Sequence, residues 1–417
     1  MIDHATAVGA LADARTSADV LAQIATVYPD LWPSVATHPG AYPGLIDWMA
    51  SRGDATAQGI RMAGQGMVVS QPAAASPASG YLQQGKMGVQ RAFDSMTGFN
   101  GEAIVHFRDL FRDTFKRHSR ADMDILMYSG TQAALSDRRW RLPWLYARVF
   151  VVLLSAFLLL WLCMLIFADN SGNVIPGVIF TGALTIPATV MVFFWEFNQA
   201  RNVSLFDVIR MFFIGGALSI LLTFIVSAMT SSFLSAETFN YGTAFVAAAL
   251  IGFTEELAKA MTVFVLMRRL SGCLVSNGLL IGAVVGTGFA VFETMGYGTS
   301  GWIQGDLEWT LATRGVLSLG GHVVWAAILG AAIMLAQRPG ATVISLRTMS
   351  WGRFLALFCV PFLLHTMWDF IAFVVPSQVV SFALMAALIV VAWVFIVRLI
   401  NSGLRQYANA LSQMPMV

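Results

Sequence analysis

Two adjacent carboxylates and an ammonium group lie inside an otherwise apolar stretch of the chain, residues 243–267. Glu255 and Glu256 are followed by Lys259, which on a helix can reach either acid because it lies four and three residues further on. A charge near the centre of a bilayer costs about 2.5–3.5 kcal/mol, so such residues persist mainly where they pair, line a cavity or do chemistry. A buried pair of this kind suits a general base that deprotonates water.

Further acids and imidazoles follow in the next three apolar stretches. Glu293 is followed by His322, and His365 precedes Asp369 by one helical turn, so that Asp369 can orient the imidazole. Two histidines and a carboxylate can hold a catalytic zinc with one open position, which makes Glu293, His322 and His365 a candidate metal set. Their spacing is not the HExxH of the zincins, so zinc is a hypothesis. Arg314 precedes His322 and could instead snorkel to the outer interface.

Peptide hydrolysis would use these groups in a consistent way. It needs a base for the water, a positive centre for the developing oxyanion and an acid for the leaving amine. Either glutamate of the adjacent pair could be the base, and a metal ion or an N–H of His322 could meet the oxyanion. The charge balance is unfavourable for burial, because four acids face one lysine: Glu255, Glu256, Glu293 and Asp369 against Lys259. The site must therefore gain protons or a cation, and we favour the metal.

The composition places these residues in a membrane. Hydrophobic residues make up 57% of the 417 residues and charged residues only 12%, with a mean hydropathy of +0.69. A net charge of +2 gives no case for nucleic-acid binding. Cys163, Cys273 and Cys359 fit neither a disulfide framework nor a zinc knuckle, and we expect buried, reduced thiols. No cleavable signal peptide is apparent, so the first membrane helix must act in targeting.

Eight apolar segments predict an all-α polytopic bundle of about eight transmembrane helices, since each is close to the roughly 20 residues that a span needs. They cover residues 143–167, 174–196, 206–229, 243–268, 275–298, 311–336, 352–374 and 378–400. Alternate linkers carry the arginines, from Arg138 before the first span to Arg405 after the last, and the opposite linkers carry neither lysine nor arginine. This bias predicts a multi-pass cell-membrane protein with both termini in the cytoplasm.

A series of small residues predicts one close helix contact. Gly278, Gly282 and Gly286 recur every four residues on the helical face that also bears Glu293. This pattern lets a neighbouring helix approach closely. We expect that neighbour to be the acidic fourth span, residues 243–268.

The region before the first span has three parts. Ser17 predicts a helix start, and prolines divide the following residues into short helical pieces rich in aromatic and aliphatic side chains. Residues 65–90 are rich in Gly, Ser, Pro, Ala and Gln, which predicts a flexible tether. Three phenylalanines and an isoleucine then share one helical face, which suits a helix on the membrane surface or one packed against the ends of the bundle: Ile104, Phe107, Phe111 and Phe115.

These patterns divide the chain into five expected regions. They are a small helical module over residues 1–64, a flexible linker over 65–97, a juxtamembrane amphipathic helical segment over 98–141, an eight-helix membrane domain over 142–402 and a cytoplasmic tail over 403–417. The module's aromatic residues could bind a protein partner, although we favour packing in the module's own core.

The ordered set of motifs on consecutive spans resembles the PrsW family of intramembrane proteases, within the CAAX-protease and bacteriocin-immunity superfamily. The motifs are Glu255-Glu256-x-x-Lys259, Phe289-x-x-x-Glu293, His322 and His365-x-x-x-Asp369. Residues 18–54 resemble variant leucine-rich repeats. The family resemblance implies hydrolysis of peptide bonds in or near the bilayer, with membrane-anchored regulatory proteins such as anti-sigma factors as one substrate class. It implies catalytic roles for Glu255, Glu256, Glu293 and His322.

Two other classes of function compete with this interpretation. Chains of acids, histidines and lysine across helices also form proton relays, as in a proton- or cation-coupled transporter. A non-catalytic membrane scaffold would explain the N-terminal module but would leave the polar cluster without a role. A protease requires the polar groups to converge on one pocket, whereas a transporter requires them to follow a path across the bilayer.

Overall fold

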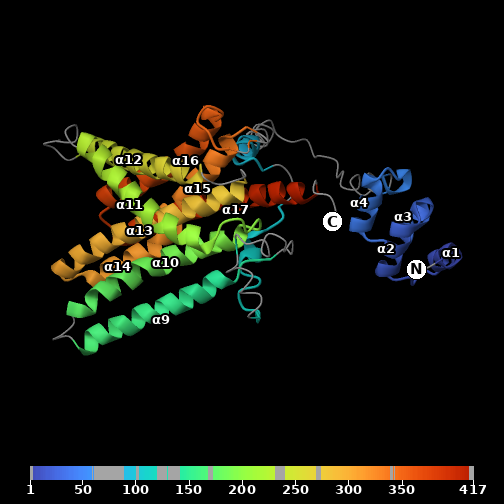
Figure 1. Cartoon of the computed structure of the whole chain (residues 1–417), viewed down its shortest axis with the longest axis horizontal. Coiled ribbons are helices and arrows are strands. Elements are labelled where there is room, and N and C mark those ends of the chain that lie inside the picture. Colours follow the sequence, from blue (N-terminus) through green and yellow to red (C-terminus); the bar gives the residue numbers. More distant parts are fainter. Residues whose placement is uncertain are drawn as a thin grey trace, which may run out of the picture. The chain divides into compact units, whose positions relative to one another are not determined.

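The computed structural model is helical in both of its parts (Figure 1). It describes residues 3–58, 60, 89–99, 103–119, 129, 141–167, 172–230, 240–268, 274–338, 341 and 343–412. The chain divides into two compact units, Met1–Lys86 and Met87–Val417. The predicted tether, residues 65–90, lies almost entirely outside the described residues.

The N-terminal unit is a stack of short helices. They are α1 (His4–Ala12), α2 (Ala18–Val27), the 3₁₀ turn η1 (Pro29–Leu31), α3 (Trp32–Ala36) and α4 (Pro43–Ser51). The helix start predicted at Ser17 is confirmed, and prolines open η1 and α4, where a missing N–H is tolerated. Leu21, Ile24, Val35 and Met49 form the fully buried centre of a small core of their own.

The second unit is a bundle of long apolar helices. Its members are α9 (Leu145–Ile166), α10 (Ile175–Phe197), α11 (Leu205–Thr230), α12 (Tyr241–Met267), α13 (Val275–Gln304), α14 (Leu307–Leu317), α15 (His322–Ala336), α16 (Trp351–Val374) and α17 (Gln378–Ser412). Among the described residues, seven helical segments are long and apolar enough to cross a membrane. They do not include the 27-residue α12, whose apolar character is lowered by its three charged residues. The all-α polytopic fold is confirmed.

The sequence predicted one continuous helix for the sixth span, but the structure breaks it into two. It consists of α14, a 3₁₀ turn η5 (Ser318–Gly320) and α15, with the break at Gly321. Gly321 has φ −91° and ψ −140°, which ends the helical hydrogen bonding. A side chain at Gly320 would meet Ile389 of α17, so only a glycine allows this close approach. The break places His322 at the first position of α15.

The glycine face of α13 packs on α15, so the predicted contact with the fourth span was wrong. A Cβ atom added at Gly278 would meet the backbone of Gly330, one at Gly282 the backbone of Ala326, and one at Gly286 the backbone of His322. The acidic α12 packs instead along α16, where Gly252 lies against Thr366 and His365. Glu293 shares the glycine face, and this packing therefore directs it toward α15.

A buried carboxylate joins α9 to α10. Glu196, near the end of α10, is only 6% exposed and accepts backbone N–H groups from Trp144, Leu145 and Tyr146 at 2.8, 2.8 and 2.9 Å. These donors belong to the first turn of α9, which has no other carboxylate cap. From the sequence this residue would be a solvated acid at a helix end, and the structure shows that it is a capping group.

The described part of the segment before α9, residues 103–119, does not form the predicted amphipathic helix. Only a 3₁₀ turn η2 (Phe107–Leu110) and further turns occupy residues 104–118. The side-chain oxygen of Asn401 in α17 accepts hydrogen bonds from the N–H groups of Ile104 and Val105 at 2.7 and 2.9 Å. These N–H groups are therefore not available for hydrogen bonds within a helix. Phe115 is 93% exposed. Cys163 and Cys359 are free thiols, as expected, but both are exposed on the protein surface rather than buried.

Candidate active site

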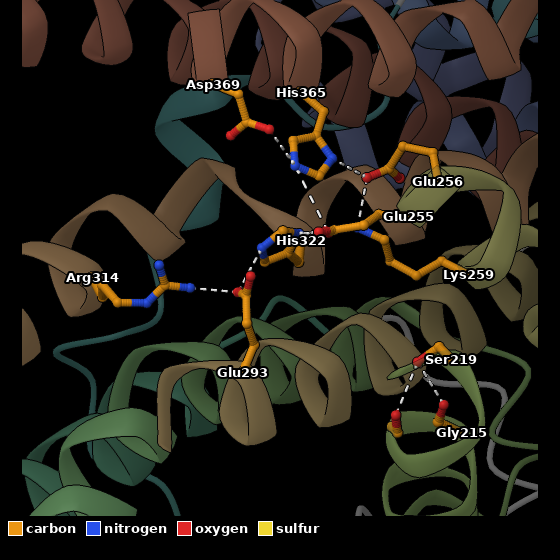
Figure 2. Close-up of polar contacts among 11 residues, drawn as sticks. Gly215, Ser219, Glu255, Glu256, Lys259, Glu293, Arg314, His322, His365 and Asp369 are labelled. Carbon is orange, nitrogen blue, oxygen red and sulfur yellow. Dashed lines mark hydrogen bonds and ion pairs between the residues drawn. The ribbon is translucent and has the colours of Figure 1, made fainter. Parts of the chain in front are cut away.

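The polar residues of α12, α13, α14, α15 and α16 converge in one place (Figure 2). A pocket of about 270 Å³ lies there, and its lining combines acids, histidines and aromatic side chains. It includes Glu255, Glu293, Arg314, His322, His365 and Asp369. The two remaining residues singled out in the sequence, Glu256 and Lys259, lie immediately behind this lining and are wholly buried. Eight residues from five helices thus form one cluster.

Glu256 is the centre of a closed, buried arrangement behind the pocket. Its Oε1 accepts hydrogen bonds from Lys259 Nζ at 2.6 Å and from His365 Nδ1 at 2.8 Å. Nδ1 carries the proton in this bond, so in the neutral imidazole the lone pair of His365 lies on Nε2, which faces Glu255 Oε2 at 3.8 Å and Asp369 Oδ2 at 3.5 Å. Glu256 has no exposed surface, so it orients His365 and balances the charge of Lys259.

His322 is held in the same manner by a second carboxylate. Lys259 Nζ can only donate, so His322 Nδ1 accepts at 3.0 Å and its Nε2 carries the proton. Nε2 donates to Glu293 Oε2 at 3.0 Å, and Arg314 binds the same oxygen. Each histidine is therefore oriented by one carboxylate.

Arg314 is a member of the cluster and does not simply extend to the interface. Besides its ion pair with Glu293, it donates to Thr294 Oγ1 at 3.2 Å and lies over the ring of Tyr297 at 4.0 Å. The balance drawn from the sequence, four acids against one lysine, therefore omitted a second cation. The residual excess of negative charge falls on Glu255 and Asp369.

Glu255 is one of two pocket-lining acids, with Asp369, that keep a buried oxygen without a hydrogen-bond partner. Its Oε2 is buried and has no hydrogen-bond partner, and the nearest cationic or imidazole nitrogens are 3.7–4.0 Å away. Among the described residues, one group of possible metal ligands brings its donor atoms within 4.8 Å of one another: Glu255, His322 and His365. The set expected from the sequence had Glu293 in place of Glu255, but Glu293 is committed to Arg314 and His322.

Two tryptophans in the pocket were overlooked in the sequence. Trp325 is 1% exposed and lies against His365, with ring centroids 4.6 Å apart, and Trp368 packs on Trp325 at 5.7 Å. Each follows a site histidine by three residues on its own helix, so a search for aromatic residues one turn beyond each histidine would have found both. They restrict the orientation of the imidazole and exclude water from one side of it.

These features define a class: a polytopic helical membrane protein with a polar, partly enclosed site made of acids and oriented histidines, as an intramembrane hydrolase requires. Residues 206–399 match the family model described as PrsW family intramembrane metalloprotease, which covers a little under half of the chain. Residues 5–61 match the Leucine Rich Repeat Variant domain. Neither the curated proteins nor the solved structures provide a match to the chain.

The two family matches confirm both resemblances drawn from the sequence. They support function as an intramembrane protease and do not favour a transporter or a scaffold. All eight residues of the cluster lie within the matched range, which begins in α11, whereas α9 and α10 precede it. The family description also supports a divalent metal, and the His/Glu group of the pocket fits one.

Proposed function

We propose that the chain is an intramembrane endopeptidase that hydrolyses a peptide bond of a membrane-anchored protein in the pocket between α12 and α16. The observation that supports this most strongly is convergence: Glu255, Glu293 and His322 line one pocket together with His365 and Asp369. A proton path across the bilayer would separate such groups along the membrane normal. A hydrolase needs them around a single reacting bond.

We further propose that the divalent metal is zinc and that Glu255, His322 and His365 hold it. Carboxylate oxygen and imidazole nitrogen are ordinary zinc donors, and the two histidines are already oriented by outer carboxylates. His365 Nε2 and Glu255 Oε2 are free to bind, whereas His322 Nδ1 must first lose its bond to Lys259. When bound, the metal would supply Lewis acidity, which polarises a carbonyl and promotes ionisation of water.

The protein's own groups would have distinct tasks. Glu255 faces the pocket and is the proposed acceptor of the water's proton, whereas Glu256 is enclosed between Lys259 and His365 and has no access to water. Glu293 and Arg314 would fix the proton of His322 on Nε2. Lys259 would keep the enclosed carboxylate ionised and compensate its charge.

Glu255 could serve as a base, as a metal ligand or as both, and two measurements separate these roles. In Glu255→Gln, loss of activity with unchanged zinc content would indicate a base. Loss of activity together with zinc would indicate a ligand. The amide retains the shape of the side chain, so either result is independent of a packing defect.

The substrate side of the proposal rests on the pocket's apolar lining and on the membrane topology. Ile251, Leu317 and Phe373 line the pocket beside the polar groups, which suits the apolar residues of a transmembrane segment. Anti-sigma-factor-like proteins are the proposed substrate class. The arginine bias of the linkers predicts that both termini are cytoplasmic, and the N-terminal module would then be able to recruit a cytoplasmic protein partner.

Reconstituted protein and a panel of single-span substrates test the activity. Wild type should cleave at least one substrate, and Glu255→Ala should not. Glu308→Ala is a matched control, because it removes an exposed carboxylate from α14 that does not line the catalytic pocket. Equal cleavage by wild type and Glu255→Ala would reject the proposed site.

Metal analysis of the purified protein tests the zinc proposal separately. Wild type should contain zinc and lose activity with a chelator, and zinc should restore it. His322→Ala should lose zinc and activity together. A metal-free protein that cleaves substrate would refute zinc while leaving the role of Glu255 in place.

A further inference from the structure

A second pocket lies at the other end of α16, far from the catalytic cluster. It has a volume of about 270 Å³ and is lined by Arg91, Asp94, Ser95, Gly98 and Arg353. Four of these belong to residues 89–98, a short helix and its C-terminal glycine, and Arg353 lies in the first turn of α16. Asp369 follows Arg353 by 16 residues, so the two pockets are separated by about 24 Å along the helix axis.

The wall formed by the short helix is fixed to α17. Arg398 of α17 forms an ion pair with Asp94, and the rings of Phe93 and Phe395 are 4.5 Å apart. Gly98 has φ +65°, a backbone conformation that favours glycine, and its carbonyl accepts from Ser402 Oγ at 3.4 Å. These contacts hold the pocket open between α16 and the short helix.

Among the described residues, the lining of the pocket has an excess of positive charge. Asp94, the only acid among the described residues that line the pocket, is already paired with Arg398, which also donates to Gln90. Arg353 uses one N–H on the carbonyl of Leu335 at 3.3 Å. Arg91 has no ion pair or hydrogen bond among the residues that the structure describes. Two guanidinium groups thus face one pocket with most of their donors unused.

The surroundings of the pocket have the composition expected at a membrane surface. Arg353 is the third residue of α16, where the positive end of the helix dipole adds to its charge. Trp351 and Leu355 on the same part of α16 are each 50% exposed, as expected for a tryptophan at the interface and a leucine facing lipid. Basic pockets between membrane helices at this level suit anionic headgroups.

We propose that the pocket lined by Arg91 and Arg353 binds the phosphate of an anionic phospholipid, with the acyl chains along the exposed side of α16. A free phosphate ion would satisfy the same guanidinium groups. The lipid is favoured because the pocket opens where a membrane-spanning helix begins and apolar surface continues beside it. The bound headgroup would connect the short helix to α16, because it would contact Arg91 on the short helix and Arg353 on α16. This link would add to the contacts that the short helix makes with α17.

Lipid retention by the full-length protein tests this proposal. The protein is placed in nanodiscs that contain phosphatidylglycerol and phosphatidylcholine, extracted into detergent, and the retained lipids are counted by native mass spectrometry. Wild type should retain phosphatidylglycerol selectively. Arg91→Gln and Arg353→Gln should each reduce its retention by about fivefold, and the double variant by about 25-fold.

The control is Arg347→Gln, which removes the same charge from the same end of the bundle, in the loop before α16 and outside the pocket. This control variant should retain as much phosphatidylglycerol as wild type. If it lost as much lipid as Arg91→Gln, general surface charge would explain the binding and the proposal would be overturned. Arg91 has no partner to lose, so Arg91→Gln should fold normally and gives a result even if Arg353→Gln does not.

Inorganic phosphate distinguishes the two possible ligands. Phosphate added at millimolar concentration should leave phosphatidylglycerol bound. Displacement of the lipid by phosphate, or binding of phosphate with no selective lipid retention, would show that the site takes the free ion and would overturn the lipid assignment. None of these outcomes depends on proteolytic activity, so the catalytic proposal stands or fails separately.

Discussion

Two glutamates are buried in membrane helices, Glu196 in α10 and Glu255 in α12, and they differ in how many hydrogen bonds their carboxylates accept. Glu196 accepts three backbone N–H groups at the start of α9. Glu255 is similarly buried, at 9% exposure, yet its Oε2 has no hydrogen-bond partner and faces a pocket. A carboxylate whose partners are all supplied by the fold stabilises structure, whereas one that lacks them is available for chemistry.

Glu256 is intermediate between Glu196 and Glu255 in its hydrogen bonding. It adjoins Glu255 in sequence, but its Oε1 is fully occupied by Lys259 and His365 on the inner side of the pocket. One residue along a helix rotates the side chain by about 100°, and this rotation separates a pocket-facing acid from an enclosed one. The comparison therefore predicts different losses for three glutamates.

The largest effect should follow substitution of Glu255. We expect Glu255→Gln to reduce cleavage of a single-span substrate by about 10²–10⁴-fold, the range for loss of a general base. Its unfolding temperature should change little, because no hydrogen bond of Oε2 is lost. A strong loss of stability with activity retained per folded molecule would reverse the roles assigned to Glu255 and Glu196.

The next effect concerns the enclosed pair of Glu256 and Lys259. Removing one partner, as in Glu256→Leu or Lys259→Met, should cost about 3–5 kcal/mol of unfolding free energy, because the other charge is left buried and unpaired. The double variant should recover part of this loss in a denaturation series. If the double variant lost as much unfolding free energy as the two single variants combined, the two charges would not stabilise each other.

A smaller loss should follow Glu196→Ala. Three N–H groups at the start of α9 would lose their acceptor, at a cost of about 2 kcal/mol. Thermal unfolding in detergent measures this, and cleavage per folded molecule should stay at the wild-type level. Loss of activity in a fully folded Glu196→Ala protein would contradict the structural role.

The smallest effect should come from a carboxylate outside the membrane, Asp109. The N–H of His106 donates to it at 2.9 Å and holds the pKa of Asp109 below its ordinary value of 3.8. The folded state therefore binds this proton less readily than the unfolded chain, so the contribution is complete above pH 3.8 and is lost as the pH falls through the lowered value. The exchange protection of the His106 amide should decrease in that window. In Asp109→Asn it should be independent of pH there, and an identical profile would exclude Asp109 as the cause.

Much of the site could be predicted because the bilayer makes charged residues conspicuous. Glu255, Lys259, Glu293, His322 and His365 stand out in apolar sequence, and the structure brings all of them into one cluster. Their partners were harder to predict. The pairing of Glu293 with Arg314 and His322 depends on α13 packing on α15, and a glycine series does not specify which neighbour it fits.

Two other predictions failed because they relied on local sequence patterns alone. A hydrophobic window spans both α14 and α15 and does not detect the break at Gly321, because hydropathy averages over about 20 residues. The helix expected around Phe111 is absent, since Asn401, almost 300 residues away in the chain, takes the N–H groups of Ile104 and Val105. No local pattern reports a partner at that separation.

The sequence by itself determined the membrane class, the helical architecture and the residues able to do chemistry, because burial of a charge in lipid is costly wherever it occurs. Tertiary structure decided which of two adjacent glutamates faces the pocket, which nitrogen of each histidine bonds to its carboxylate, and that Glu255 brings a donor atom within 4.8 Å of both histidines. These outcomes depend on helix rotation and on contacts between helices. Both are set by packing across the whole bundle and not by the spacing of residues along one segment.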